Sequence, residues 1–192
     1  RIEDVGNLEL LMLRLPDLVG SPLSINSIRE DLQVSHKTVS RWLQSLERLY
    51  AVFRIAPFGS PKIRAVKKEQ KHYHFDWALV PSLPFRFENM VACHLLKCVH
   101  HEQDAKGLDV ELRYFRDVDG REVDFVVVEE GKPTQFIECK WSDAPVGKGL
   151  RYLKARFPQG AFWQISAEGT NDYISADNIR VAPAVKFLQR LV

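Results

Sequence analysis

Two short apolar segments separated by a turn constrain the fold of this chain more than any other feature. Residues 122–128 and 134–141 contain valine, isoleucine and phenylalanine, and Glu130, Gly131 and Lys132 lie between them. Such residues favour strands, and a short segment with glycine between two strands is typical of a hairpin. We therefore predict two adjacent antiparallel strands over these residues.

The segments around the hairpin show the periodicities of further helices and strands. Apolar residues recur at every fourth position over residues 87–99, which indicates a helix with one apolar face. By the same criteria we expect strands at 111–115 and 161–165 and helices at 147–157 and 184–191. A helix, three strands, a helix and a strand make a mixed α/β unit.

The N-terminal part of the chain predicts helices joined by short turns. A helix over residues 5–15 ends at Pro16, and a short helix and a turn precede a longer helix over residues 38–50. The longer helix carries an apolar stripe made of Val39, Trp42 or Leu43, Leu46 and Leu49.

A strand expected over residues 51–55, with a turn at Pro57 and Gly59, follows these helices. Helix, turn, helix and strand pair is the pattern of a winged helix-turn-helix. The sequence therefore predicts an α/β chain of two units. A winged helix-turn-helix covers residues 1–60, and a mixed sheet flanked by helices covers residues 61–192.

The longer N-terminal helix also has a polar face, opposite its apolar stripe. Lys37, Ser40, Arg41 and Gln44 lie on this face. Side chains of these types contact phosphates and base edges when a helix enters the major groove of DNA. These four residues are candidates for DNA binding. The alternative is that the helical unit only packs against another domain, and the sequence leaves both interpretations open.

The net charge of +2 conceals an uneven distribution. Residues 1–80 carry a net charge of +3, and residues 81–192 carry −1. The most basic stretch is 54–74, where six lysines and arginines accompany one glutamate and where Lys67 and Lys68 are further DNA-binding candidates. Basic residues beside aromatic ones suit a surface that contacts phosphates, although a solvated basic hairpin explains this charge equally well.

Charged side chains interrupt the two apolar strands. Asp124 lies in the first strand, and Glu138 and Lys140 lie two residues apart in the second, so that both point to one face. Counting back from the turn places Asp124 level with them, and Glu88 in the preceding helix offers another carboxylate. Two carboxylates suffice for Mg²⁺, which prefers oxygen ligands and keeps several waters. Alternatively, the acids only pair with Lys140 or Arg121 at the edge of a sheet.

These residues, in this order, resemble the core of the PD-(D/E)xK nuclease superfamily. The whole chain is similar to the C-terminal region of a bacterial and archaeal family of AAA-type ATPases. In that family a P-loop ATPase module precedes a winged-helix segment and a restriction-endonuclease-like domain of unknown function. The stretches that carry the resemblance are residues 24–53, 87–91, 120–125 and 137–140.

The resemblance implies a restriction-endonuclease-like fold for the mixed sheet and its helices. It also implies Asp124 and Glu138 as metal ligands, with Lys140 and Glu88 as further catalytic residues. The cofactor would be Mg²⁺ or Mn²⁺, and the partners would be DNA and an ATPase domain upstream in the same longer chain.

The chain departs from the pattern of the superfamily at two positions. Val123 precedes Asp124 in place of proline, and Lys148 stands four residues before Tyr152, where some relatives have glutamine. The Gly-x-x-x-x-Gly-Lys-Ser/Thr motif of ATPases does not occur, so any ATPase activity would lie outside these residues. Two functions stay open: a metal-dependent nuclease, and a non-catalytic nuclease-like module that binds DNA or protein and regulates the ATPase.

Cysteine content and hydropathy predict a cytoplasmic location. Three cysteines are too few, and odd in number, for a disulfide framework. The longest apolar run covers residues 125–128, far below the ~20 residues that a membrane helix needs, so no membrane partner is expected. Cys93 and Cys98 lack the spacing of a zinc site.

Overall fold

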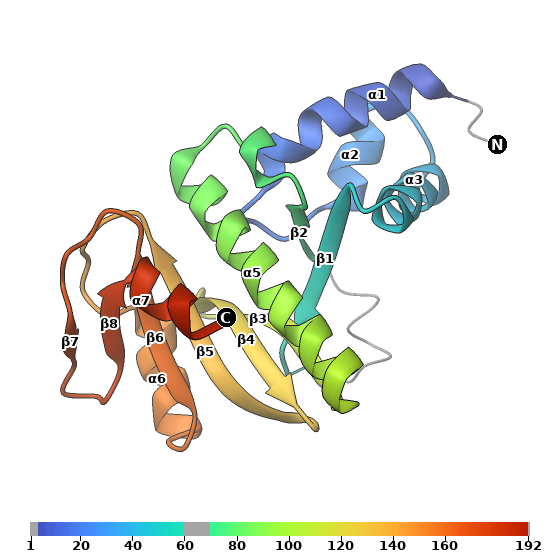
Figure 1. Cartoon of the computed structure of the whole chain (residues 1–192). Coiled ribbons are helices and arrows are strands. Elements are labelled where there is room, and N and C mark those ends of the chain that lie inside the picture. The colour runs from blue at the N-terminus through green and yellow to red at the C-terminus, as the bar shows by residue number, and fades with distance from the viewer. Residues whose placement is uncertain (1–3, 60–69, 192) are drawn as a thin grey trace.

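The computed structural model describes residues 4–59 and 70–191, and within these ranges it contains a helical N-terminal part and an eight-stranded mixed sheet (Figure 1). The α-helices are α1 (Val5–Arg14), α2 (Ile25–Asp31), α3 (His36–Arg48), α5 (Leu83–Lys106), α6 (Lys148–Arg156) and α7 (Ala184–Leu188). The strands are β1 (Val52–Pro57), β2 (Lys71–His74), β3 (Val110–Arg116), β4 (Glu122–Glu129), β5 (Lys132–Lys140), β6 (Ala161–Ser166), β7 (Tyr173–Ile174) and β8 (Arg180–Pro183). The predicted mixed α/β class is confirmed.

Helices α1 to α3 pack around a small apolar core of their own. Helix α3 begins at His36 because Ser35 caps it, accepting a hydrogen bond from the Thr38 backbone N–H at 3.0 Å. The predicted apolar stripe is buried at Val39, Trp42, Leu43 and Leu46. The prediction is wrong for Leu49, which is 74% exposed, because the helix ends at Arg48.

Strands β4 and β5 form the predicted antiparallel hairpin, with Phe125 opposite Ile137. Glu130 and Gly131, at the turn, have φ values of 49° and 75°, and positive φ at both central residues suits a tight hairpin turn. Strand β3 pairs antiparallel with β4, and β6 pairs parallel with β5. The strand order β2-β1-β3-β4-β5-β6-β8-β7 therefore places the hairpin in the middle of the sheet.

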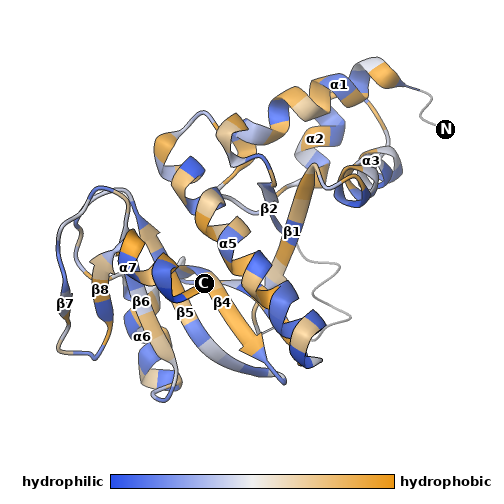
Figure 2. Ribbon diagram, viewed as in Figure 1, coloured by the Kyte–Doolittle hydropathy of each residue, from blue (hydrophilic) through white to orange (hydrophobic). Residues whose placement is uncertain are grey.

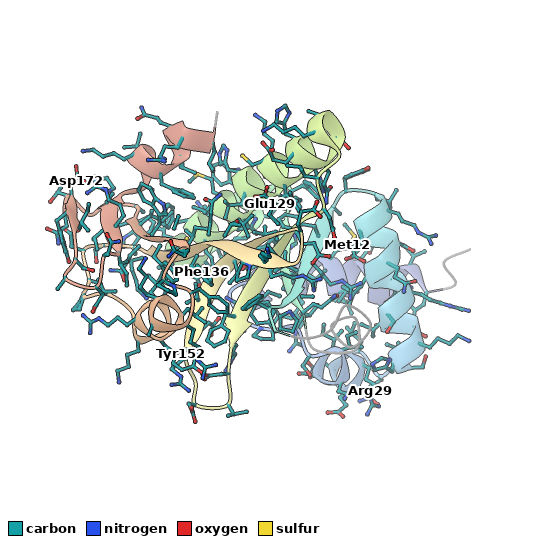
Figure 3. All side chains as sticks on the ribbon, turned by 90° about the horizontal axis from the view of Figure 1, so that it is seen from below. Met12, Arg29, Glu129, Phe136, Tyr152 and Asp172 are labelled. Carbon is teal, nitrogen blue, oxygen red and sulfur yellow. The ribbon has the colours of Figure 1, made fainter. Side chains whose placement is uncertain are left out.

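Side chains of the hairpin alternate between two cores. Phe125, Val127 and Ile137 pack in the core that helix α5 covers, whereas Val126 and Phe136 pack in the core that helix α6 covers. Strands that are buried on both faces are hydrophobic along most of their length, as Figure 2 shows for β4. In Figure 3 the labelled Phe136 lies on the side of the sheet toward α6.

Strands β1 and β2 belong to the same sheet as the hairpin. Strand β1 pairs antiparallel with β2 and parallel with β3. Phe53, Ile55 and Tyr73 add to the core beneath α5. The sheet thus continues across the predicted boundary at residue 60, and the division into residues 1–60 and 61–192 stays a prediction, as does the winged helix.

Strands β2, β7 and β8 lie outside the predicted elements. They span only four, two and four residues, which is too short for an alternating pattern to be recognised in the sequence. Within the described ranges, no helix combines the length and the apolar character needed to cross a membrane.

Candidate functional site

The hairpin places three of the predicted site residues beside one another. Asp124 adjoins Phe125 and Glu138 adjoins Ile137, and these two neighbours form the last pair at the open end of the hairpin. Asp124 Oδ2 accepts a hydrogen bond from the backbone N–H of the next residue of β5 at 2.8 Å. Lys140 Nζ donates to Glu138 Oε1 at 2.7 Å. Both carboxylates are buried, so the two strands place charged groups inside an apolar sheet.

Glu88 reaches the same place from helix α5. It follows Phe87 in the buried stripe of that helix and is itself buried. Tyr73, on strand β2, donates from its hydroxyl to Glu88 Oε1 at 2.7 Å. Glu88 and Asp124 also share an ion-pair partner, Lys71. The structure therefore brings together all four residues predicted as catalytic, while their catalytic roles stay predictions.

Lys71 is the residue of this site that sequence reasoning missed. The basic stretch over residues 54–74 was expected to contact phosphates or solvent, but Lys71 is fully buried. Its Nζ lies 2.7 Å from Glu122 Oε1, 3.2 Å from Glu88 Oε1 and 3.5 Å from Asp124 Oδ1. Strand β2 has a polar sequence, so the sequence contains no apolar pattern from which the burial of its first residue could be predicted.

Burial and the neighbouring charge of Asp124 shift two of the site's glutamates toward their neutral forms. Burial, followed by the charge of Asp124, raises the pKa of Glu88 to about 7 and that of Glu138 to about 8. Burial by itself would lower the pKa of Lys71, but the charges of the surrounding carboxylates outweigh it and raise that pKa. In the same way, partial burial of Lys140 would lower its pKa, but the charge and the hydrogen bond of Glu138 raise it. Both lysines are therefore ammonium ions at neutral pH.

One oxygen of the site has no hydrogen-bond partner in the part of the chain that the structure describes. Glu138 is 8% exposed, and its Oε2 is buried and unpaired. An unpaired buried carboxylate oxygen is costly unless a proton or a cation joins it. Mg²⁺ fits this donor set, because it needs only one or two carboxylates and completes its shell with water or phosphate oxygens. Across the described ranges, no three or more His, Cys, Asp and Glu side chains are grouped to hold a metal ion.

The predicted DNA-binding residues of helix α3 are mostly open to solvent. Lys37, Arg41 and Gln44 are exposed. Ser40 is partly buried, and its Oγ donates to the His36 backbone oxygen at 2.9 Å, so its hydroxyl is engaged within the helix. The other two candidates, Lys67 and Lys68, lie outside the described residues.

Of the two pairing partners that the alternative interpretation names, Lys140 pairs with Glu138, whereas Arg121 pairs with neither Asp124 nor Glu138. It forms ion pairs with Asp117 and Asp119 in the turn before β4. Its guanidinium also lies 3.7 Å from the centre of the Tyr152 ring. Tyr152 is thus contacted by an arginine from the β3–β4 turn.

Comparison with known families divides the chain near the start of α5. The model of a domain of unknown function, DUF4143, matches residues 85–187, which is more than half of the chain. The chain belongs to this family. A second family model, a domain of unknown function named DUF8612, matches residues 1–89. No curated protein and no solved structure matches the chain. Asp124, Glu138 and Lys140 lie in the DUF4143 domain, Glu88 lies where the two matches overlap, and Lys71 lies in the N-terminal match.

Proposed function

We propose that the DUF4143 domain carries a metal-dependent phosphodiesterase site that acts on DNA and that belongs to a longer AAA-type ATPase chain. The observation that carries this proposal is the position of Asp124, which is hydrogen-bonded to the β5 backbone between Glu138 and Lys140, together with the Lys140–Glu138 ion pair and the unpaired Glu138 Oε2. Domains of this family are typically found with AAA ATPases. The succession α5-β3-β4-β5-α6-β6, with β3 to β5 antiparallel and β6 parallel to β5, supports a likeness to the PD-(D/E)xK core.

Asp124 and Glu138, on the two neighbouring strands of the hairpin, would hold the divalent ion. Bound there, the ion would lower the pKa of a water molecule and offset charge on the phosphate. Lys140 is tethered by Glu138 yet a third of its side chain is exposed, so its ammonium can reach a phosphate oxygen or orient the attacking water. Glu88 lies deeper, on Tyr73 and Lys71, and holds these groups in place.

The first test is a cleavage assay with plasmid, linear and branched DNA in Mg²⁺ or Mn²⁺. Lys140→Met is expected to lower the cleavage rate by about 10²-fold while leaving Mn²⁺ affinity nearly unchanged, because it removes charge beside the phosphate but no ligand. Asp124→Asn is expected to lose Mn²⁺ binding, measured by calorimetry. Lys132→Met, an exposed lysine at the start of the same strand, is the matched control. Absence of cleavage by the wild type and of Mn²⁺ binding would reject the proposal.

One observation favours a second function, a non-catalytic module that binds DNA or protein and regulates the ATPase. Three carboxylates of the site already have a counter-ion in Lys71, as in a purely structural buried ion pair. Under this alternative, Asp124→Asn lowers stability but changes neither DNA affinity nor the regulation of the ATPase. The same set of variants therefore distinguishes the two functions.

DNA binding by helix α3 is a separate prediction. The double variant Lys37→Ala/Arg41→Ala is expected to weaken binding to all duplex sequences and to reduce the slope of log affinity against log salt by about 2, since each phosphate contact contributes about 1. Fluorescence anisotropy over a salt series measures both quantities. Lys97→Ala/Lys106→Ala on α5, which removes the same charge elsewhere, serves as control. An unchanged slope in the α3 variant would mean that this helix does not contact DNA.

A further inference from the structure

Lys71 enters the acidic site from a different part of the chain than the acids themselves. Strand β2 lies in the segment matched by the N-terminal family model, whereas Glu122 and Asp124 lie in the DUF4143 domain. The Lys71 side chain has no exposed surface. Its Nζ has carboxylate partners on α5 and on β4, the nearest being Glu122 at 2.7 Å. Lys71 is therefore a buried, positively charged component of the site and not a solvent-exposed surface lysine.

The charges around Lys71 leave room for one divalent ion. Among the described residues, four carboxylates, those of Glu88, Glu122, Asp124 and Glu138, face two ammonium groups, those of Lys71 and Lys140. When all four carboxylates are ionised, as they would be around a bound metal ion, two formal negative charges remain, which one divalent cation neutralises. Without Lys71, three negative charges would remain, and a single divalent ion would no longer balance them.

The two cations also divide the oxygens of the site between them. Lys71 takes Glu88 Oε1, Glu122 Oε1 and Asp124 Oδ1. Glu138 Oε2, which Lys71 does not contact, is the buried oxygen without a partner in the described ranges. Many phosphodiester-cleaving sites gather carboxylates around two metal ions about 3.5–4 Å apart. Here an ammonium occupies the position between Glu88, Glu122 and Asp124, and the unpaired oxygen belongs to Glu138, the remaining carboxylate.

We propose that Lys71 takes the place of a second metal ion, so that the site binds one divalent cation, between Asp124 and Glu138. This inference rests on the proposed phosphodiesterase function and adds its metal stoichiometry. It also makes the site composite, because the segment before α5 supplies one of its two cations. Removing the ammonium should open a second position lined by Glu88, Glu122 and Asp124.

The test counts Mn²⁺ ions bound per chain by isothermal calorimetry, with electron paramagnetic resonance to detect coupling between neighbouring ions. The wild type is expected to bind one ion without such coupling. Lys71→Gln is expected to bind two ions, with the coupled spectrum of a close pair. Lys71→Arg keeps the positive charge and is expected to bind one ion. Because Lys71→Gln removes a buried charge, its folding is checked first by circular dichroism.

Each possible metal count either supports or contradicts the proposed role of Lys71. Two ions in the wild type would overturn the role of Lys71 and leave the phosphodiesterase proposal intact, and this result needs no variant to fold. One ion in the wild type and an unchanged count in folded Lys71→Gln would also overturn it. No ion in the wild type but one in Lys71→Gln would overturn the stoichiometry, because Lys71 would then exclude metal altogether. No ion in any of the chains would reject the phosphodiesterase proposal and this inference together.

Discussion

Replacing Lys71 with methionine is expected to lower the free energy of unfolding by about 3–5 kcal/mol in the absence of divalent ions. Methionine has a similar length, so the change removes the charge rather than creating a large cavity. Three carboxylates, those of Glu88, Glu122 and Asp124, would lose their shared counter-ion. They would then have to take up protons or remain charged and unpaired in a buried site. Urea unfolding in the presence of a chelator measures the loss.

Lys106→Met provides the matched control for this variant. Lys106 also pairs with a glutamate, Glu102, but its side chain is 57% exposed. Exposed pairs of this kind contribute little because water and salt screen them, so the control should lose less than about 0.5 kcal/mol. If Lys71→Met and Lys106→Met cost the same, Lys71 is not the counter-ion of the site.

A double-mutant cycle separates the loss of the ion pair from the loss of packing. Glu122 is the nearest partner of Lys71, at 2.7 Å, and part of its side chain reaches solvent. Once Lys71 is methionine, neutralising this acid by Glu122→Gln should restore stability, because it removes one unpaired charge. In the wild-type background the same change should destabilise. Additive effects of the two substitutions would show that the groups do not interact.

The centre of the fold was accessible from sequence because its signals are local. Residues 122–128 and 134–141 alternate between two faces, and Gly131 marks the turn between them, so the hairpin and the level of Asp124 follow from counting. The stripe at every fourth residue locates helix α5 for the same reason. Strand β2 has no such signal: its residues are lysine, histidine, tyrosine and histidine, and all four are buried. It is buried through pairing with β1 and packing on α5, which are contacts between distant parts of the chain.

The residues of the candidate site likewise fall into two groups, those placed by local periodicity and those placed by contacts between distant segments. Asp124, Glu138 and Lys140 lie on one hairpin, so their convergence follows from strand periodicity. Lys71 and Glu122 form an ion pair across many residues of sequence. Charge counts suggested that the basic stretch faces outward, since charge runs usually do. The structure shows a lysine of that stretch turned inward, because a group of buried acids requires a positive charge.

The last prediction concerns His72, which lies on β2 next to Lys71 and is fully buried. Its Nε2 lies 2.8 Å from the Leu15 backbone oxygen, so the neutral ring with a proton on Nε2 donates there. Burial, which outweighs that hydrogen bond, together with the nearby charges of His74 and Arg54, lowers the pKa of His72 from 6.5 to about 4. The folded protein therefore keeps this ring neutral over a range of pH in which the unfolded chain protonates it.

The sign of the effect follows from proton uptake. Between pH 6.5 and about 4 the unfolded chain binds a proton at His72 that the folded chain does not, so stability falls as the pH is lowered through this window. The pKa difference corresponds to roughly 3 kcal/mol. Glu88 and Glu138 act in the opposite direction, because their pKa values in the fold are raised to about 7 and about 8, and they lose stability as the pH rises.

Because these contributions oppose each other, the informative quantity is the difference in unfolding free energy between the wild type and His72→Gln. Glutamine can donate to the same Leu15 oxygen but does not titrate. As the pH falls from above 6.5 to about 4, the wild type should lose roughly 3 kcal/mol of unfolding free energy relative to His72→Gln. His101→Gln, at an exposed position of α5, should leave stability within about 0.5 kcal/mol of the wild type at each pH. A pH-independent difference for His72→Gln would mean that this ring is not held neutral by the fold, and that the contact between β2 and Leu15 does not depend on its protonation.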